Sequence, residues 1–199
     1  MGKFILTSTG LSAPPIRAKI NDLVALLPKN RAVIITTAAE DKEQNKYCLL
    51  AKQQLLELDF KEVLFLDLES ENIQKLSNAD VIYVSGGNTF KLMKFARERN
   101  FGSVIKTVTN TNTLFIGVSA GSIILGKSIE IAGIAGGDAN DVGLKDLSGF
   151  VLLNNDIHPH YVDTQEEEIK KYENKHNVKV LRITDNEAIM YDNKLSYIK

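Results

Sequence analysis

Short, nearly continuous apolar runs alternate with longer segments of helical periodicity along most of this chain. Runs such as Val33-Ile34-Ile35 and Val63-Leu64-Phe65-Leu66 are typical of strands that are covered on both faces. Strands of this kind are joined in parallel by right-handed crossover helices. The alternation therefore predicts an α/β fold with a doubly wound, mainly parallel sheet.

The expected elements fall into two groups. In the first 118 residues we expect strands at 3–7, 31–37, 62–68, 81–85 and 113–118, separated by helices at 16–27, 44–58, 72–79 and 89–99. After residue 160 we expect a charged helix at 163–177 and short strands at 178–184, 187–191 and 194–198. No repeat, low-complexity stretch or linker interrupts the pattern, so the sequence predicts one domain over residues 1–199.

Composition narrows the class of protein. Hydrophobic residues make up 44% and charged residues 25% of the 199 residues, with a net charge of −1. This balance is that of a globular protein, and it offers no basic excess for nucleic acid. No signal peptide or membrane-spanning apolar run is apparent, and the single cysteine, Cys48, is expected to be structural. We therefore expect a cytoplasmic protein without membrane or nucleic-acid partners.

The sharpest motif is Gly-Val-Ser-Ala-Gly at residues 117–121. It follows the apolar run 114–116 and precedes Ser-Ile-Ile-Leu at 122–125, which can open a helix. A G-x-S-x-G motif between strand and helix is typical of a nucleophile elbow, a sharp turn that exposes a serine hydroxyl. N–H groups at the helix start can stabilise an oxyanion. Ser119 is the candidate nucleophile; the alternative is a turn that needs its glycines only for packing.

A second glycine-rich turn, Ser-Gly-Gly-Asn-Thr at residues 85–89, follows the expected strand 81–85. On a parallel sheet this turn lies at the same edge as Ser119, where ligands bind. Adjacent glycines allow close backbone approach to a ligand. We expect the N–H groups of Gly87 and Ala120 to form a two-donor oxyanion hole, with Asn88 beside the substrate. The alternative is a plain turn in which Asn88 or Thr89 caps the next helix.

A serine nucleophile needs a base, and the chain has three histidines. His176 lies in a charged segment and is expected at the surface. His158 and His160 flank Pro159, which restricts the backbone and can fix the direction of a ring. No carboxylate or thiolate pattern accompanies this H-x-H pair, so a metal site is not favoured. No dinucleotide or P-loop motif is present, and no cofactor is expected.

The acid that orients the imidazole in a catalytic triad is sought between Ser119 and His160. Asp138 follows Gly136-Gly137, in a stretch able to reach back over the site. The carboxylates of this interval are Glu130, Asp138, Asp141, Asp146 and Asp156.

Three stretches together resemble the peptidase E family of serine dipeptidases, whose wider clan includes the cyanophycinases. They are Val-Ser-Gly-Gly-Asn-Thr-Phe-Lys-Leu at 84–92, the pentapeptide 117–121, and Ile-His-Pro-His-Tyr at 157–161. The resemblance implies a class I glutamine amidotransferase-like fold, a flavodoxin-like three-layer sandwich, with serine replacing cysteine at the elbow. It also implies His160 as the base, Gly87 and Ala120 as oxyanion donors, and Asp138 as the acid, with Glu130 or Asp141 in reserve.

One stretch departs from the family pattern. Peptidase E prefers dipeptides with N-terminal aspartate, and an arginine-containing stretch after its histidine can pair with that carboxylate. Residues 162–168 of this chain contain no arginine and are strongly acidic. Aspartyl specificity is therefore left open, and another N-terminal residue, including a basic one, is a candidate.

The sequence thus predicts a cofactor-free serine peptidase that acts on dipeptides or short peptides through an acyl-enzyme, as a monomer or homodimer. An esterase, amidase or cyanophycinase-like isopeptide hydrolase would use the same site. A non-catalytic binding protein that keeps the pocket is the alternative from a different class.

Overall fold

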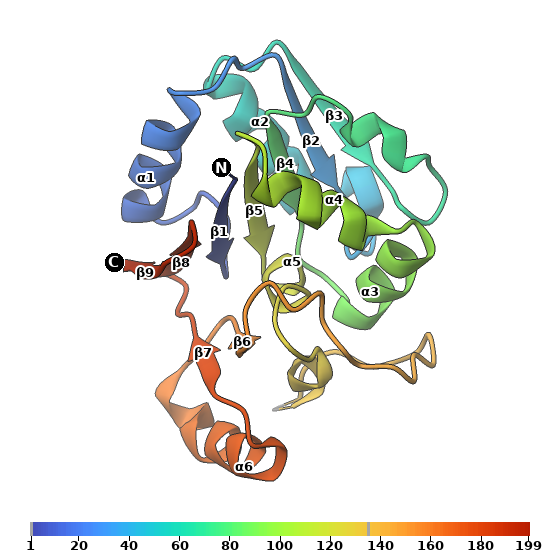
Figure 1. Ribbon diagram of the computed structural model, residues 1–199, viewed down its shortest axis with the longest axis vertical. Helices are drawn as coiled ribbons and strands as arrows, with labels where there is room; N and C mark the ends of the chain where they lie inside the picture. Colours follow the sequence, from blue (N-terminus) through green and yellow to red (C-terminus); the bar gives the residue numbers. More distant parts are fainter. Residues whose placement is uncertain (1, 135) are drawn as a thin grey trace.

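The computed structural model describes residues 2–134 and 136–199. Seven strands form the central sheet in the order β3-β2-β4-β5-β1-β8-β9 (Figure 1). Strands β1 to β5 pair in parallel, while β8 pairs antiparallel with β1 and with β9. The predicted α/β class and mainly parallel sheet are confirmed. The strands are β1 (Lys3–Thr7), β2 (Arg31–Ile35), β3 (Glu62–Leu66), β4 (Val81–Val84), β5 (Leu114–Val118), β8 (Ala188–Tyr191) and β9 (Leu195–Ile198).

Helices cover both faces of this sheet. Helices α1 (Pro14–Val24) and α2 (Lys46–Glu57) lie on one face, whereas α3 (Thr89–Glu98), α4 (Phe101–Thr109) and α5 (Ala120–Ile123) lie on the other. Successive residues of a strand point to opposite faces. In β1, Phe4 and Leu6 accordingly pack in the α3/α4 core and Ile5 packs in the α1/α2 core. Burial on both faces explains why these strands read as continuous apolar runs.

A second, two-stranded parallel sheet lies beyond the carboxyl ends of β1 and β5, at the bottom of Figure 1. It pairs β6 (Asp156–His158) with β7 (Val180–Arg182), and α6 (Glu166–His176) connects the two strands after a 3₁₀ turn at Asp163–Gln165. The residues that follow β6 and β7 therefore emerge side by side, facing the edge of the main sheet where ligands bind in α/β proteins.

Several elements differ from the sequence expectation. The helix expected at 72–79 is a single 3₁₀ turn, Ile73–Leu76, and α4 and β6 were not anticipated. Two further 3₁₀ turns are Lys42–Gln44 and Glu130–Gly133. Cys48 is fully buried in α2, as expected of a structural cysteine.

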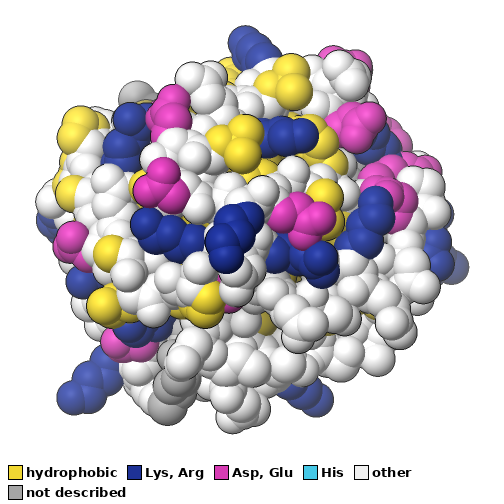
Figure 2. Space-filling model, turned by 90° about the horizontal axis from the view of Figure 1, so that it is seen from above, with side chains coloured by type: hydrophobic (Ala, Val, Ile, Leu, Met, Phe, Trp, Pro, Cys, Tyr) yellow, Lys and Arg dark blue, Asp and Glu magenta, His cyan; other side chains and the backbone are white. Residues whose placement is uncertain are grey.

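The amino-terminal end of the main sheet carries no large area of one charge sign. Viewed from above (Figure 2), Lys and Arg side chains lie among Asp, Glu and hydrophobic side chains, and no histidine is visible among the residues drawn. Within residues 2–134 and 136–199, no helix is both long and apolar enough to cross a membrane.

Candidate active site

Ser119 occupies a sharp turn between β5 and α5. Its backbone has φ 50° and ψ −110°, a strained conformation for a residue with a side chain. The flanking glycines are required by space: a Cβ on Gly117 would lie 2.5 Å from the Gly121 carbonyl oxygen, and one on Gly121 would lie 2.4 Å from the Val84 carbonyl oxygen. Both glycines of the G-x-S-x-G motif therefore lie where the backbone of the turn is packed too closely, against itself and against β4, to leave room for a side chain.

The turn is held by buried hydrogen bonds to the end of β1. The Ser119 N–H donates to the Thr7 carbonyl oxygen over 2.9 Å. The fully buried Ser122 hydroxyl donates to the carbonyls of Thr7 and Gly117, each at 2.9 Å, and accepts the Thr7 N–H at 3.0 Å. This bonding fixes Ser119 relative to β1 and leaves its side chain partly exposed.

The glycine-rich turn after β4 passes against Ser119. A Cβ on Gly86 would lie 3.0 Å from the Ser119 Cβ and 3.7 Å from its Oγ. Gly87 has φ 132°, and a Cβ there would lie 2.0 Å from the Ala38 carbonyl oxygen, so no other residue fits. Neither Gly87 N–H nor Ala120 N–H has a hydrogen-bond acceptor among the described residues. Two backbone donors beside a serine are the groups that an oxyanion hole needs.

Asn88 has a different role from the one expected. Its Oδ1 accepts the Lys91 N–H at 2.8 Å, which caps α3, and its Nδ2 donates to the Ala139 carbonyl at 2.8 Å. Both polar ends of the side chain are thus engaged within the protein. The geometry matches the helix-cap alternative rather than contact with a substrate.

His160 is paired with a carboxylate, but this carboxylate is Asp185. The His160 Nδ1 lies 2.8 Å from Asp185 Oδ1, and the two side chains are 49% and 60% exposed. His160 follows β6 and Asp185 follows β7, so the parallel pairing of these strands brings them together. The His160 N–H also donates to the Ser8 hydroxyl at 2.9 Å. Because Ser8 adjoins Thr7, which holds Ser119, the segments of Ser119 and His160 meet at one end of β1 (neighbouring Cα atoms are about 3.8 Å apart).

The prediction that Asp138 orients His160 is corrected by this geometry. Asp138 Oδ2 accepts the Thr89 N–H at 2.7 Å, so this carboxylate caps the start of α3. The reserve residue Glu130 lies 3.5 Å from His176 Nε2 and 3.8 Å from Lys175 Nζ. Asp141 is exposed in a turn. None of the three is the carboxylate bound to His160.

Asp185 lies outside the interval between Ser119 and His160 in which the sequence predicts the acid. One sequence signal was available: Asp185 directly follows the expected strand 178–184, as His160 follows the segment that became β6. Carboxyl ends of parallel strands meet at one edge, so a carboxylate at the end of a strand after position 160 is also a candidate partner of His160.

The other two histidines are engaged elsewhere. His158 is buried, its Nε2 lies 3.2 Å from Gln165 Oε1, and burial lowers the pKa of its imidazole. His176 stacks on Tyr172 with ring centroids 4.4 Å apart, and its side chain is only 24% exposed, so it is less solvated than expected. No cluster of three or more His, Cys, Asp or Glu side chains suited to a metal occurs within residues 2–134 and 136–199.

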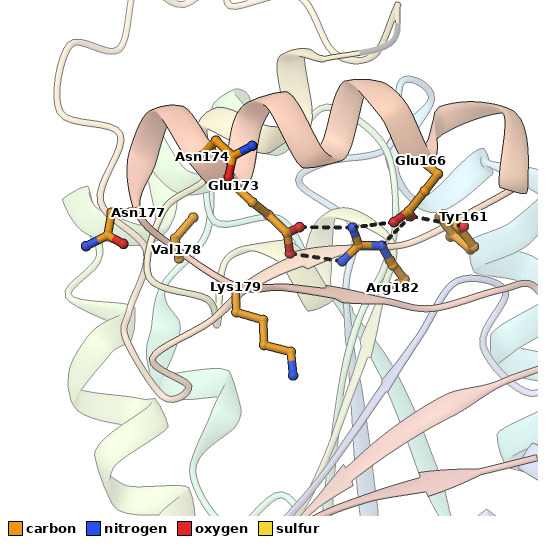
Figure 3. A pocket seen from close by; sticks show the side chains of 8 residues that line it. All are labelled: Tyr161, Glu166, Glu173, Asn174, Asn177, Val178, Lys179 and Arg182. Atoms are coloured by element: carbon orange, nitrogen blue, oxygen red, sulfur yellow. Dashed lines mark hydrogen bonds and ion pairs between the residues drawn. The ribbon is translucent and has the colours of Figure 1, made fainter.

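An ion-pair network centred on Arg182 joins α6 to β7. Arg182 Nε donates to Glu166 over 2.7 Å, and Arg182 Nη1 donates to Glu173 over 3.0 Å. Figure 3 shows the guanidinium between the two carboxylates, with the Tyr161 hydroxyl turned toward Glu166 at 3.1 Å. The adjoining groove of about 840 Å³ is lined by Tyr161, Glu166, Glu173, Asn174, Asn177, Val178, Lys179 and Arg182. Ser119, His160 and Asp185 do not line it, so the groove lies outside the candidate active site.

The network predicts acid-sensitive stability. Hydrogen bonds from Arg182 lower the pKa of Glu166 and Glu173 below their usual range. The stabilisation is therefore complete above the unfolded-state pKa of about 4.3 and is lost as the pH falls through the lower folded-state pKa. We expect Arg182→Met to have a lower thermal midpoint than the wild type at pH 7. Its midpoint should fall less than that of the wild type when the pH is lowered to about 3.

Circular dichroism melts at both pH values measure this effect. Arg17→Met is the control, because the Arg17 Nε donates to the Leu11 carbonyl and not to a carboxylate. Burial raises the pKa of Asp156, so its protonation at low pH stabilises the folded state instead of destabilising it. Asp156 is present in all three proteins, so this effect cancels in the comparison. An Arg182→Met midpoint that falls with acid as steeply as that of Arg17→Met would contradict the assignment.

A strained serine between strand and helix and a carboxylate-paired histidine at the same sheet edge are features that α/β serine hydrolases share. Comparison with known families agrees: the profile of peptidase family S51 matches residues 4–197. The chain belongs to peptidase family S51.

Individual relatives are named peptidase E. The chain is 34% identical over 94 residues to peptidase E of Escherichia coli strain K12 / DH10B and to that of Shigella boydii serotype 18. The aligned stretch spans 46% of this chain and 38% of those proteins.

Two crystal structures share the fold. A Listeria monocytogenes EGD-e protein provisionally assigned to peptidase E has a TM-score of 0.79 and 24% identity, over 99% of this chain and 98% of that protein. A peptidase from an acI-B1 Actinobacterium has a TM-score of 0.61 and 18% identity, over 96% of this chain and 83% of that protein.

Proposed function

We propose that this protein is a serine peptidase that hydrolyses dipeptides or short peptides, with Ser119 as nucleophile, His160 as general base and Asp185 as the acid that orients it. The observation that carries the proposal is the shared anchoring of the site. The Ser119 N–H is bound by Thr7, the last residue of β1, and the His160 N–H is bound by Ser8, the residue that follows; His160 Nδ1 lies 2.8 Å from the Asp185 carboxylate.

The chemistry follows from these positions. The Ser119 oxygen attacks the carbonyl carbon of the scissile bond while His160 Nε2 takes the hydroxyl proton. The oxyanion formed accepts hydrogen bonds from the N–H groups of Gly87 and Ala120. The C–N bond then breaks as His160 gives its proton to the leaving amine, and water hydrolyses the acyl-enzyme by the same steps.

Asp185 acts on the base rather than on the substrate. A carboxylate that accepts the Nδ1–H keeps Nε2 free to take the serine proton, and it stabilises the imidazolium that forms. With Nδ1 occupied at 2.8 Å, Nε2 is the remaining nitrogen of His160 for proton transfer.

A fluorophosphonate probe tests the nucleophile before any substrate is known. The serine oxygen displaces fluoride from phosphorus and its proton passes to the base, so labelling requires an activated serine but no particular peptide. We expect labelling of the wild type at Ser119, located by peptide mass spectrometry, and no labelling of Ser119→Ala.

A panel of dipeptides, β-linked peptides and simple esters then tests the bond that is cleaved. Cleavage of α-linked dipeptides supports the proposal. Cleavage of esters alone would indicate an esterase, and cleavage of β-linked peptides alone would indicate an isopeptide hydrolase. A wild type that is neither labelled nor active on any of these compounds would favour a binding protein.

A further inference from the structure

Three consecutive residues at the end of β1 bind the three segments that carry the proposed triad. The Thr7 carbonyl accepts the Ser119 N–H at 2.9 Å. The Ser8 hydroxyl accepts the His160 N–H at 2.9 Å. The Thr9 hydroxyl donates to the Asp185 carbonyl at 3.0 Å. One short stretch, residues 7–9, therefore contacts every member of a triad whose members are otherwise far apart in the chain.

Ser8 is the centre of this arrangement. Ser8 is only 2% exposed, although serine is a polar residue that is usually found at the surface. Besides accepting the His160 N–H, its hydroxyl donates to the Ile183 carbonyl at 3.0 Å, with the Thr184 carbonyl at 3.2 Å. A single hydroxyl thus joins the backbone that leads into His160 to the backbone that leads into Asp185.

His160 depends on such an anchor for two reasons. Its φ of 55° lies in the left-handed region, which a residue with a side chain adopts only where its surroundings fix it. Its side chain is 49% exposed, so packing restrains the ring weakly. The ring direction then rests on two polar contacts, the backbone bond to Ser8 and the Nδ1 bond to Asp185.

We propose that Ser8 is a positioning residue of the reaction, which sets His160 against Ser119 through the His160 backbone, and that Thr9 does the same for Asp185. The inference rests on the proposed function, because it assigns a purpose to the geometry of that triad. Neither hydroxyl takes a proton or touches the reacting atoms. Their contribution is the alignment of nucleophile and base, where a shift of about 1 Å can cost about 100-fold in rate.

Ser8→Ala removes the hydroxyl and with it the hydrogen bonds to His160, Ile183 and Thr184. We expect kcat to fall about 10- to 100-fold while KM changes little, because the loss falls on alignment rather than on substrate contact. The rate of fluorophosphonate labelling at Ser119 should fall in parallel. Ser103→Ala is the control, since the Ser103 hydroxyl donates to the carbonyl of Asn100, the residue that precedes α4. A folded Ser8→Ala with wild-type kcat and labelling rate would overturn the proposal.

A pair of variants at Thr9 keeps the test independent of folding, because Thr9 is partly exposed. Thr9→Val deletes the hydroxyl and keeps the shape, whereas Thr9→Ser keeps the hydroxyl. We expect a smaller loss of kcat in Thr9→Val, and recovery in Thr9→Ser. Should Ser8→Ala fail to fold, equal kcat values for the two Thr9 variants would overturn the proposal.

A proton NMR signal separates this inference from the proposed function. The His160 Nδ1–H bonded to Asp185 is expected as a low-field imidazole resonance in the wild type, absent from Asp185→Ala. It should weaken or broaden in Ser8→Ala and stay unchanged in Ser103→Ala. This readout needs no turnover, so it remains decisive if the wild type cleaves no peptide and the proposed function fails. An unchanged resonance in folded Ser8→Ala would contradict the positioning role.

Discussion

Ser119→Ala is expected to lower kcat by about 10⁶-fold, the loss seen when the nucleophile of a serine peptidase is removed. The remaining rate would come from substrate binding and the backbone donors alone. The fold should persist, because the hydrogen bonds that hold this turn come from the Ser119 N–H and from the Ser122 side chain, not from the Ser119 hydroxyl. Steady-state kinetics on the best peptide of the panel measures the change.

Ser103→Ala is the matched control for this substitution. It also removes one serine hydroxyl, but that hydroxyl is exposed and donates to the Asn100 carbonyl at 2.8 Å, away from residues 7–9. Its kcat should equal that of the wild type, and all three proteins should share one circular dichroism spectrum. Turnover by Ser119→Ala at a rate near that of Ser103→Ala would exclude Ser119 as the nucleophile.

Asp185→Asn is expected to produce the second largest loss, about 10³-fold in kcat, with a fold that is unchanged. An amide nitrogen in place of the carboxylate oxygen favours the tautomer with the proton on Nε2, which cannot accept the serine proton, and it removes the charge that stabilises the imidazolium. The exposure of Asp185, 60%, places the expected loss below that of a buried triad acid.

Asp138→Asn makes the same chemical change at the residue that the sequence favoured. Because Asp138 caps α3 through the Thr89 N–H, we expect a lower thermal midpoint and a kcat close to that of the wild type. Kinetics and melting curves of the two variants, measured side by side, decide between the carboxylates. A large loss of kcat in Asp138→Asn, with Asp185→Asn fully active, would restore the assignment made from sequence.

Sequence reasoning succeeded where the signal is local. The strand β1 was predicted with its observed bounds, and β5 to within one residue, because uninterrupted apolar runs report burial on both faces. The proposal of Ser119 and His160 rests on equally local signals, because a glycine-framed serine and a proline-framed histidine constrain their own backbones. Both motifs are read from five adjacent residues.

The pairing of His160 with Asp185 is a long-range property. It depends on β6 lying parallel to β7, and each of these strands is only three residues long. Asp138 misled because a carboxylate that caps a helix and one that orients an imidazole look alike in sequence. The buried face of a helix is also ambiguous from residue type alone: Leu50 of α2 is 41% exposed, while the polar Gln54 is buried.

The proposed triad is divided between the two sheets of the molecule, which share one hydrophobic core. His160 and Asp185 belong to one strand–helix–strand unit, β6-α6-β7, whereas Ser119 belongs to the main sheet. If that unit were displaced as a rigid body, His160 and Asp185 would stay paired, and only their distance from Ser119 would change. Insertions into loops of the main sheet away from β1 are therefore expected to leave the pairing of His160 with Asp185 intact.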